Sequence, residues 1–260
     1  SAEEQVALLA RHAPTLEIDV VGSFDRIGVI KLDADDRVSV DSAAPVAYTR
    51  ITYTRLAGVV HRQLVYTFWF SERPPGSAGA FDLFAGKLDG VVWRVTVDST
   101  GEALVYDSIH ACGCYHLFFP TEKVAARDLP NTLDESLFVP QTLPAPRASD
   151  RIVLRLESGT HYLQRVLPSA DRNSVADTVY QLKDERTLTT LTRASGGTRS
   201  TYDEDGLIPG SERGERWFFW PMGIESAGQM RQWGRHATAF VGRRHFDDPV
   251  LFDAYFELRR

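Results

Sequence analysis

Short runs of alternating apolar and polar residues, each bounded by turn residues, constrain the fold of this chain more than any other feature. The clearest pair of runs, residues 48–55 and 59–70, is joined through Ala57 and Gly58. Successive side chains on a β-strand point to opposite faces, so residues two apart share a face. In the second run this period predicts a core-facing set: Val60, Leu64, Tyr66, Phe68 and Phe70.

The same signal recurs along most of the chain and predicts a mainly β fold. Each segment is short, rich in β-branched or aromatic residues, and bounded by Gly, Pro, Asp or Ser. The predicted strands are residues 16–21, 26–32, 46–56, 59–70, 91–97, 103–109, 115–119, 152–156 and 162–166. Many short strands with turn signals between them indicate an antiparallel β-sandwich.

Helices are expected mainly at the two ends. Residues 3–12 have helical spacing of apolar residues and stop before Pro14, while residues 248–258 are predicted to form a helix capped by Asp247 or Asp248. Residues 171–184 are a further short helical candidate. We expect one sandwich domain over residues 1–260, with the proline-dotted segment 120–150 as a long loop, because strands resume at once after it.

Composition excludes some classes of protein. A net charge of −6 argues against a nucleic-acid partner, because such proteins present a basic face to the phosphate backbone. No stretch approaches the roughly 20 apolar residues of a transmembrane helix, so we expect a soluble protein. The nucleophile-elbow, zincin, phosphate-loop and dinucleotide-binding motifs are absent from the sequence, which removes the commonest hydrolase, metalloprotease and nucleotide-binding readings.

Three features bear on origin and location. Arg supplies 25 of the 29 basic residues, a bias typical of a GC-rich bacterial genome. The sequence starts at Ser1 without Met, which fits a mature protein after removal of a signal peptide, so we expect a periplasmic or secreted location. Cys112 and Cys114 are the only cysteines, too few for a disulfide scaffold, and their close spacing indicates local chemistry.

The segment His110-Ala-Cys112-Gly-Cys114-Tyr-His116 is the strongest functional signal. Its ligand-type side chains recur at every second residue, so an extended chain would project all four from one face, whereas a tight turn at Gly113 would gather them around one centre. Thiolates with imidazoles suit a transition metal such as Zn, Cu or Fe. Inert packing of the cysteines and a Cys-x-Cys disulfide or redox pair remain open alternatives.

Four ligands within seven residues can hardly all reach one ion, so we expect a composite metal site. His161, His236 and His245 are the candidates for the remaining ligands. Tyr115 and Arg235 are candidate catalytic residues that would orient a substrate. The leading hypothesis is a metalloenzyme of unknown reaction, an oxidoreductase or hydrolase, with no further organic cofactor.

A second hypothesis comes from residues 216–236, where aromatic residues alternate with Arg. Core packing with Arg stems laid along apolar surface explains this pattern simply. The alternative is a binding module in which Trp217, Trp220 and Trp233 with nearby Arg hold a sugar, a lipid head group or an anionic ligand. In that case the cysteine pair would be a disulfide or structural.

The order of segments 10–16, 90–97, 106–110 and 153–161 resembles the β-sandwich superfamily of vacuolar-sorting-like proteins and necrosis-inducing toxins. The resemblance implies a sandwich fold and a motif of His or Asp, Trp and Glu that binds a divalent cation. Trp93 stands for the Trp of that motif and Asp89 for its acidic member, but Arg94 occupies the Glu position. Toxin activity is therefore not carried over from this resemblance.

Overall fold

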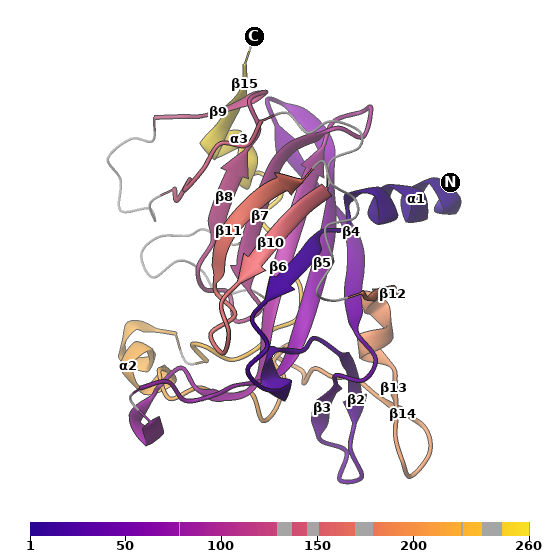
Figure 1. Cartoon of the computed structure of the whole chain (residues 1–260), viewed down its shortest axis with the longest axis vertical. Coiled ribbons are helices and arrows are strands. Elements are labelled where there is room, and N and C mark those ends of the chain that lie inside the picture. Colours follow the sequence, from indigo (N-terminus) through magenta and orange to yellow (C-terminus); the bar gives the residue numbers. More distant parts are fainter. Residues whose placement is uncertain are drawn as a thin grey trace.

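The structure of the chain is a computed structural model, which describes residues 1–77, 79–128, 137–144, 151–169, 179–224, 226–235 and 246–259. Its centre is a six-stranded sheet in the order β12-β4-β5-β6-β7-β8 (Figure 1). The strands are β4 (Val46–Leu56), β5 (Val59–Arg73), β6 (Gly86–Val97), β7 (Ala103–His110), β8 (Leu117–Pro120) and β12 (Gln181–Asp184). Only β12 pairs in parallel, with β4, and the other neighbours are antiparallel.

A three-stranded sheet covers one face of this large sheet. It consists of β1 (Thr15–Ile18), β10 (Arg151–Leu156) and β11 (Leu163–Ser169), with β10 in the middle. Leu16 and Leu154 from the small sheet pack with Tyr66 and Trp93 from the large one in a single apolar cluster. Two sheets that share one core form a sandwich, so the predicted fold class is confirmed.

The other face of the large sheet is covered mainly by later parts of the chain. Ile208, Met230 and Phe246 pack there against Trp69 and Val92. The remaining elements are short: β2 (Val29–Leu32) with β3 (Val38–Asp41), β13 (Leu191–Thr192) with β14 (Thr198–Arg199), β9 (Val124–Ala126) with β15 (Phe256–Leu258), η1 (Ser23–Asp25), η2 (Gly79–Phe81), η3 (Glu185–Thr189), α2 (Arg216–Phe219), η4 (Trp220–Met222) and α3 (Leu251–Tyr255).

Burial on both faces changes one detail of the predicted strand pattern. Tyr66 and Phe68 lie in the core as expected, but Thr67, on the opposite face of β5, is buried as well. The two-residue period predicts that Val60 faces the core, and this prediction is wrong, because Val60 is 67% exposed. It lies beside the turn at the β4–β5 hairpin end, where the sandwich no longer covers the strand.

The ends of the chain differ from prediction in length. Helix α1 (Ala2–His12) begins one residue earlier, where the Ser1 hydroxyl accepts the Glu4 N–H in a capping box. The C-terminal helix is only α3, after which the chain extends as β15 and pairs with β9 inside the predicted loop 120–150. Val250, and not an Asp, is the N-cap residue of α3.

Two further predictions from the sequence, a helix at residues 171–184 and the absence of a transmembrane helix, can be compared with the structure. Residues 181–184 of the predicted helix 171–184 form strand β12, and the earlier part of that segment lies mostly outside the described residues. Within the described ranges, no helix has the length and apolarity needed to cross a membrane.

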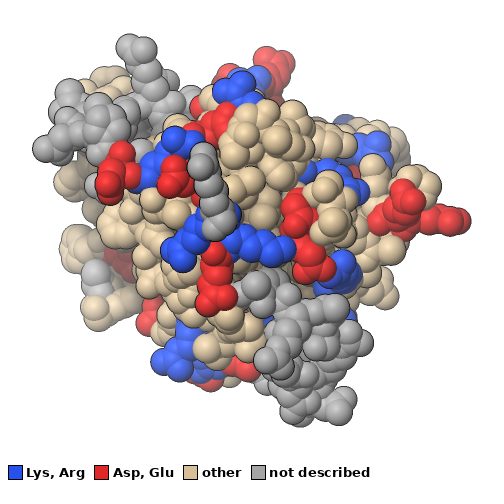
Figure 2. All heavy atoms as spheres, turned by 90° about the horizontal axis from the view of Figure 1, so that it is seen from above, with Lys and Arg blue, Asp and Glu red and all other residues tan. Residues whose placement is uncertain are grey.

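On the end of the molecule seen in Figure 2, acidic and basic side chains are interspersed, and neither sign forms a continuous patch there.

Candidate functional site

The cysteine segment forms a tight turn at the end of β7. The Gly113 N–H donates to the His110 carbonyl oxygen at 2.8 Å, and the His110 N–H donates to the Cys114 carbonyl oxygen at 2.9 Å. Gly113 has φ +92°, a left-handed conformation that glycine adopts without a steric penalty. Tyr115 is also left-handed, at φ +60°, which is costly for a residue with a side chain. The turn thus holds local strain beside the thiols.

The two cysteines lie close together and are not joined by a disulfide. Cys112 is buried and Cys114 is half-buried, and both are free thiols. A side-chain hydrogen bond with Cys112 and burial hold the pKa of Cys114 well above that of an ordinary thiol.

The thiols face a small cavity of about 20 Å³, enough for one water-sized group. Its walls come from five separate parts of the chain, which the fold brings together at one end of the large sheet. The lining residues are Arg73, Phe84, Asp89, His110, Cys112, Cys114, Tyr115, Arg213, Glu215, Gly228 and Met230. Three of the predicted metal ligands and the predicted catalytic Tyr115 therefore meet at one place.

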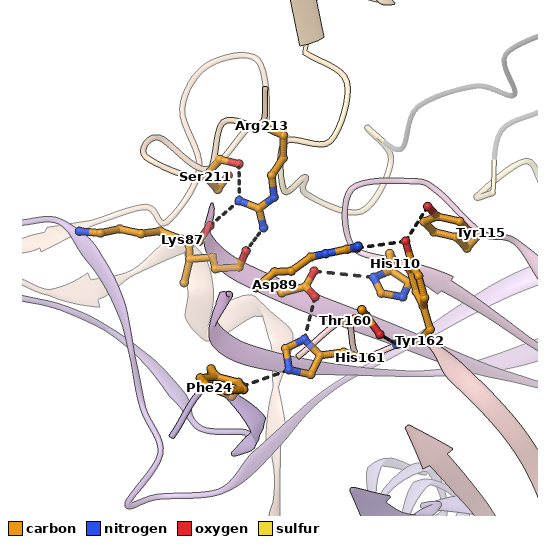
Figure 3. A network of polar contacts seen from close by, with 12 residues as sticks. Phe24, Lys87, Asp89, His110, Tyr115, Thr160, His161, Tyr162, Ser211 and Arg213 are labelled. Carbon is orange, nitrogen blue, oxygen red and sulfur yellow. Dashed lines mark hydrogen bonds and ion pairs between the residues drawn. The ribbon is translucent and has the colours of Figure 1, made fainter. Parts of the chain in front are cut away.

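Asp89 is the hub of the polar network beside this cavity (Figure 3). Its Oδ2 lies 2.7 Å from His161 Nδ1, and its Oδ1 lies 3.7 Å from His110 Nδ1. Burial alone would raise the pKa of Asp89, but hydrogen bonds and charge interactions with His110 and His161 outweigh burial and hold the pKa well below its usual range. Asp89 is therefore a buried carboxylate that links two imidazoles from different sheets.

His161 is committed to this network through both ring nitrogens. Nδ1 faces Asp89, and Nε2 lies 3.1 Å from the Phe24 carbonyl oxygen. Nε2 also lies 3.7 Å from Asp25 Oδ1. The ring is fully buried and stacks on Phe70 with 3.7 Å between centroids. In this arrangement neither nitrogen of His161 is free to ligate a metal ion.

Asp25 braces the loop that carries His161. Its carboxylate accepts the Val21 N–H at 2.8 Å, the Gly159 N–H at 2.7 Å and the Ser158 hydroxyl at 2.8 Å. Burial opposes ionisation, but these hydrogen bonds lower the pKa of Asp25 overall. The β10–β11 connection is thereby tied to the loop before β2.

An aromatic wall closes the side of the cavity near His110. The Tyr162 hydroxyl donates to the Tyr115 hydroxyl at 2.6 Å and accepts from Arg73 Nη1 at 3.1 Å. The Arg73 guanidinium also lies over the rings of Tyr162 and Phe84, at 4.9 and 5.3 Å from their centroids. Arg73 Nε is buried without a hydrogen-bond partner in the described part of the chain, so this cation has an unused donor next to the cavity.

Two further guanidiniums and one carboxyl group complete the charges around the thiols. Arg213 is buried and donates to the carbonyl oxygens of Lys87 and Leu88. Arg231 Nε donates to the Cys112 carbonyl oxygen at 3.2 Å, and burial lowers the pKa of Arg231, an effect that ionised Cys112 and Cys114 offset in part. Burial raises the pKa of Glu215, against the charge of Arg213. The thiols thus sit among cationic groups.

His116 is separated from this site by the large sheet itself. It follows the turn, and its Nε2 lies 2.8 Å from Asp107 Oδ2. Asp107 and His110 are three residues apart on β7, so their side chains project from opposite faces. On its face, Asp107 forms a buried ion pair with Arg94, 2.6 Å between Nη2 and Oδ2, which explains why Arg stands after Trp93.

The remaining predicted residues are not brought to the cavity by the described structure. Arg235 is exposed and packs against Gly206, outside the cavity lining. His236 and His245 lie outside the described residues, so the predicted composite site stays a prediction. Over the ranges that the structure describes, no three or more His, Cys, Asp or Glu side chains are arranged to hold a metal ion together.

Several site residues carried no sequence signal strong enough to single them out. Arg73, Arg213 and Glu215 occur in segments without a recognisable motif. The sequence indicated Asp89 only as the acidic member of a family motif. Its position before Gly90 and the apolar run of β6 was a further signal, because a carboxylate buried in a strand needs polar partners. No family model, curated protein or solved structure matches this chain.

Proposed function

We propose that the chain binds a soft transition-metal ion through the thiolates of Cys112 and Cys114, and that this ion is Cu(I). The observation that carries the proposal is the pair of free, adjacent thiols turned toward one small cavity by the left-handed Gly113. Thiolates are soft ligands that favour Cu(I) among the metals of cells, together with Zn and iron–sulfur clusters.

The number of ligands favours Cu(I) over Zn. A structural Zn site takes four protein ligands and a catalytic one takes three, and the described residues offer no such group. Cu(I) is satisfied by two thiolates. His110 is the nearest candidate for an additional contact, because it lines the same cavity.

The charge of the surroundings favours the same ion. Two thiolates with Cu(I) carry a net charge of −1, which the neighbouring Arg213 and Arg231 guanidiniums stabilise. A dication with neutral additional ligands would gain nothing from these cations. Glu215, with its raised pKa, adds little negative charge beside the site at neutral pH.

A thiol–disulfide pair is the second candidate function. It is favoured by the closeness of the two thiols and by the neighbouring Arg231, whose charge acts against the effects that raise the pKa of Cys114. A Cys-x-Cys disulfide closes a short, strained ring and would be easily reduced, as in labile or regulatory disulfides.

Anaerobic titration with Cu(I) against a chromophoric chelator tests the metal proposal. We expect the wild-type chain to withdraw one Cu(I) from the chelator, and Cys112→Ser or Cys114→Ser to lose more than about 100-fold in affinity, because loss of a direct ligand exceeds the 10 to 100-fold effect of outer-shell changes. Met222→Leu is the matched control: it removes a sulfur that is 61% exposed and lies outside the cavity lining, and it should leave the affinity unchanged.

Two results would overturn the metal proposal. One is a wild-type protein that leaves all Cu(I) with the chelator, and the other is equal affinity of wild type and both serine variants. Equilibration of the metal-free protein in glutathione buffers addresses the second candidate. A reversible intramolecular disulfide in the range of cellular thiol buffers, together with failure of the Cu(I) titration, would select the redox function.

A further inference from the structure

An exposed apolar tip lies on two loops at one end of the molecule. Five large side chains of these loops are between 61 and 87% exposed: Phe81, Trp217, Phe218, Trp220 and Met222. We call these five side chains, together with Leu83 and Phe84, the apolar tip. Single exposed apolar residues are ordinary, but a contiguous group of aromatic and Met side chains marks an interaction site.

The two loops of the apolar tip are held against each other by the backbone. The Glu215 N–H donates to the Leu83 carbonyl oxygen at 3.2 Å, and Gly214 packs within van der Waals distance of Leu83. In Figure 1, α2 lies at the lower left edge of the molecule, with the purple turn of η2 beneath it. The tip is therefore a convex projection built from two distant parts of the sequence.

The backbone of the tip already has its hydrogen bonds. The N–H groups of Trp217, Phe218 and Gly223 each donate to a carbonyl oxygen three residues earlier, and the Asp82 N–H donates to the Gly79 carbonyl oxygen. A peptide segment enters an apolar medium readily only when its polar backbone groups are paired internally. These short helical turns meet that condition better than open loops would.

The charged side chains at the apolar tip differ in their surroundings. Asp82 accepts the N–H groups of Gly76 and Phe84 with its two carboxylate oxygens, so its negative charge is engaged by the backbone. Glu215 is buried, whereas the partly exposed guanidinium of Arg216 lies 4.7 Å from the Trp217 ring centroid. Within residues 79–84 and 216–222, the charged side chains are therefore Asp82, whose carboxylate is bound by backbone N–H groups, and Arg216, whose guanidinium lies beside an exposed tryptophan.

We infer that the apolar tip inserts into the interface of a lipid bilayer that contains anionic lipids. Trp is enriched at membrane–water interfaces, where its ring is buried and its N–H stays near the head groups, and an adjacent Arg attracts anionic head groups. The convex form fits a deformable lipid surface. The inference does not depend on metal binding by the cysteines.

A second copy of the chain fits this tip less well. Two hollows in the described part of the surface, about 580 and 730 Å³ in volume, are large enough to take aromatic side chains. Their walls carry charged residues, Asp33 and Lys87 in the first and Arg50 and Arg186 in the second. Apolar residues such as Val38 in the first hollow and Ile51 in the second lie beside these charges, so neither hollow is a purely apolar socket for the tryptophans.

Co-sedimentation with vesicles tests the inference, using phosphatidylcholine alone and phosphatidylcholine mixed with phosphatidylglycerol. We expect binding to the mixed vesicles, a roughly tenfold loss of the partition coefficient for each of Trp217→Ala and Trp220→Ala, and a loss of the preference for anionic lipid in Arg216→Gln. Val59→Ala/Val60→Ala is the matched control, because it removes exposed apolar side chains far along the sheet and should bind as wild type does.

Quenching of Trp fluorescence by brominated phosphatidylcholine gives a second readout that folding defects do not imitate. Trp69 and Trp93 are buried, and the half-buried Trp233 packs against Phe246, so most of the quenching should come from the tip and disappear in Trp217→Ala/Trp220→Ala. Cys112→Ser/Cys114→Ser should bind vesicles normally even if the metal proposal fails. Absence of binding to either vesicle would overturn the inference, and so would a lipid-free dimer, seen by sedimentation velocity, that the double Trp variant abolishes.

Discussion

Replacement of Asp89 by Asn tests whether this carboxylate holds the site together. Asn has nearly the same shape, but it removes the buried negative charge that faces His161 at 2.7 Å and His110 at 3.7 Å. We expect the variant to weaken the hydrogen bond to His161 Nδ1, because a neutral amide oxygen is a weaker acceptor than a carboxylate. The other ring nitrogen keeps its contact with the Phe24 carbonyl oxygen, and the Asp25 carboxylate stays 3.7 Å from it.

The size of the effect follows from these two contacts. A hydrogen bond to a charged group contributes about 1.5–3 kcal/mol, and the longer contact with His110 adds little, so the free energy of unfolding should fall by about 2 kcal/mol. The loss should stay below the 3–5 kcal/mol of a broken buried ion pair, because the Asp25 carboxylate also lies 3.7 Å from His161 Nε2. In a chain of this size, about 2 kcal/mol lowers Tm by roughly 4–8 °C.

Urea unfolding and calorimetry of four proteins measure this prediction: wild type, Asp89→Asn, His161→Gln and the double variant. The two single changes should be strongly non-additive, because each removes the same contact. Asp33→Asn, in the exposed β2–β3 turn, should change stability by less than about 0.5 kcal/mol. Additive effects, or an Asp89→Asn variant as stable as wild type, would refute the role assigned to Asp89.

Two other predictions concern the frame of the site. Because the pKa of Asp25 is lowered in the folded state, its contribution to stability should be complete above the pKa of an unfolded Asp, about 4, and should fade as the pH falls through the lower folded pKa. The difference in the free energy of unfolding between wild type and Asp25→Asn should therefore shrink in acid. A difference that grows below pH 4 would contradict this prediction. Gly228→Ala should destabilise the fold by more than about 1 kcal/mol, because residue 228 has φ +77° and an added Cβ would lie 2.0 Å from Glu215 Oε1. The same change should lower the rate of Cys112 alkylation or of Cu(I) uptake. Unchanged unfolding curves and unchanged uptake would count against the described cavity.

The long strands were predictable because their period and residue types agree with the final environment. Residues 46–56 were predicted with the observed bounds of β4, since both ends carry clear turn residues. The short strands β3, β9 and β15 were missed, because three or four residues are too few to show a period, and their pairing depends on long-range contacts. Val60 shows the reverse case, where the period is correct but the core ends before the strand does.

The site was predictable only in its local part. The sequence pattern indicated a cluster at residues 110–116 and left open whether the chain is extended or turns at Gly113, and the structure shows the turn. The pattern did not indicate that His116 would contact Asp107, on the face of the sheet opposite to His110. A turn interrupts the alternation of faces along a strand, and the geometry of the turn cannot be derived from the spacing of the residues. The partners Asp89, Arg213 and Glu215 come from distant segments and meet the thiols only through the tertiary fold.

X-ray absorption at the copper edge of Cu(I)-loaded protein tests the proposed thiolate site most directly. The proposal predicts that sulfur dominates the first shell, from Cys112 and Cys114, and that this signal is lost in Cys112→Ser/Cys114→Ser but kept in Met222→Leu, which lies outside the cavity lining. A first shell of nitrogen and oxygen alone, or an identical sulfur signal in the double serine variant, would contradict it.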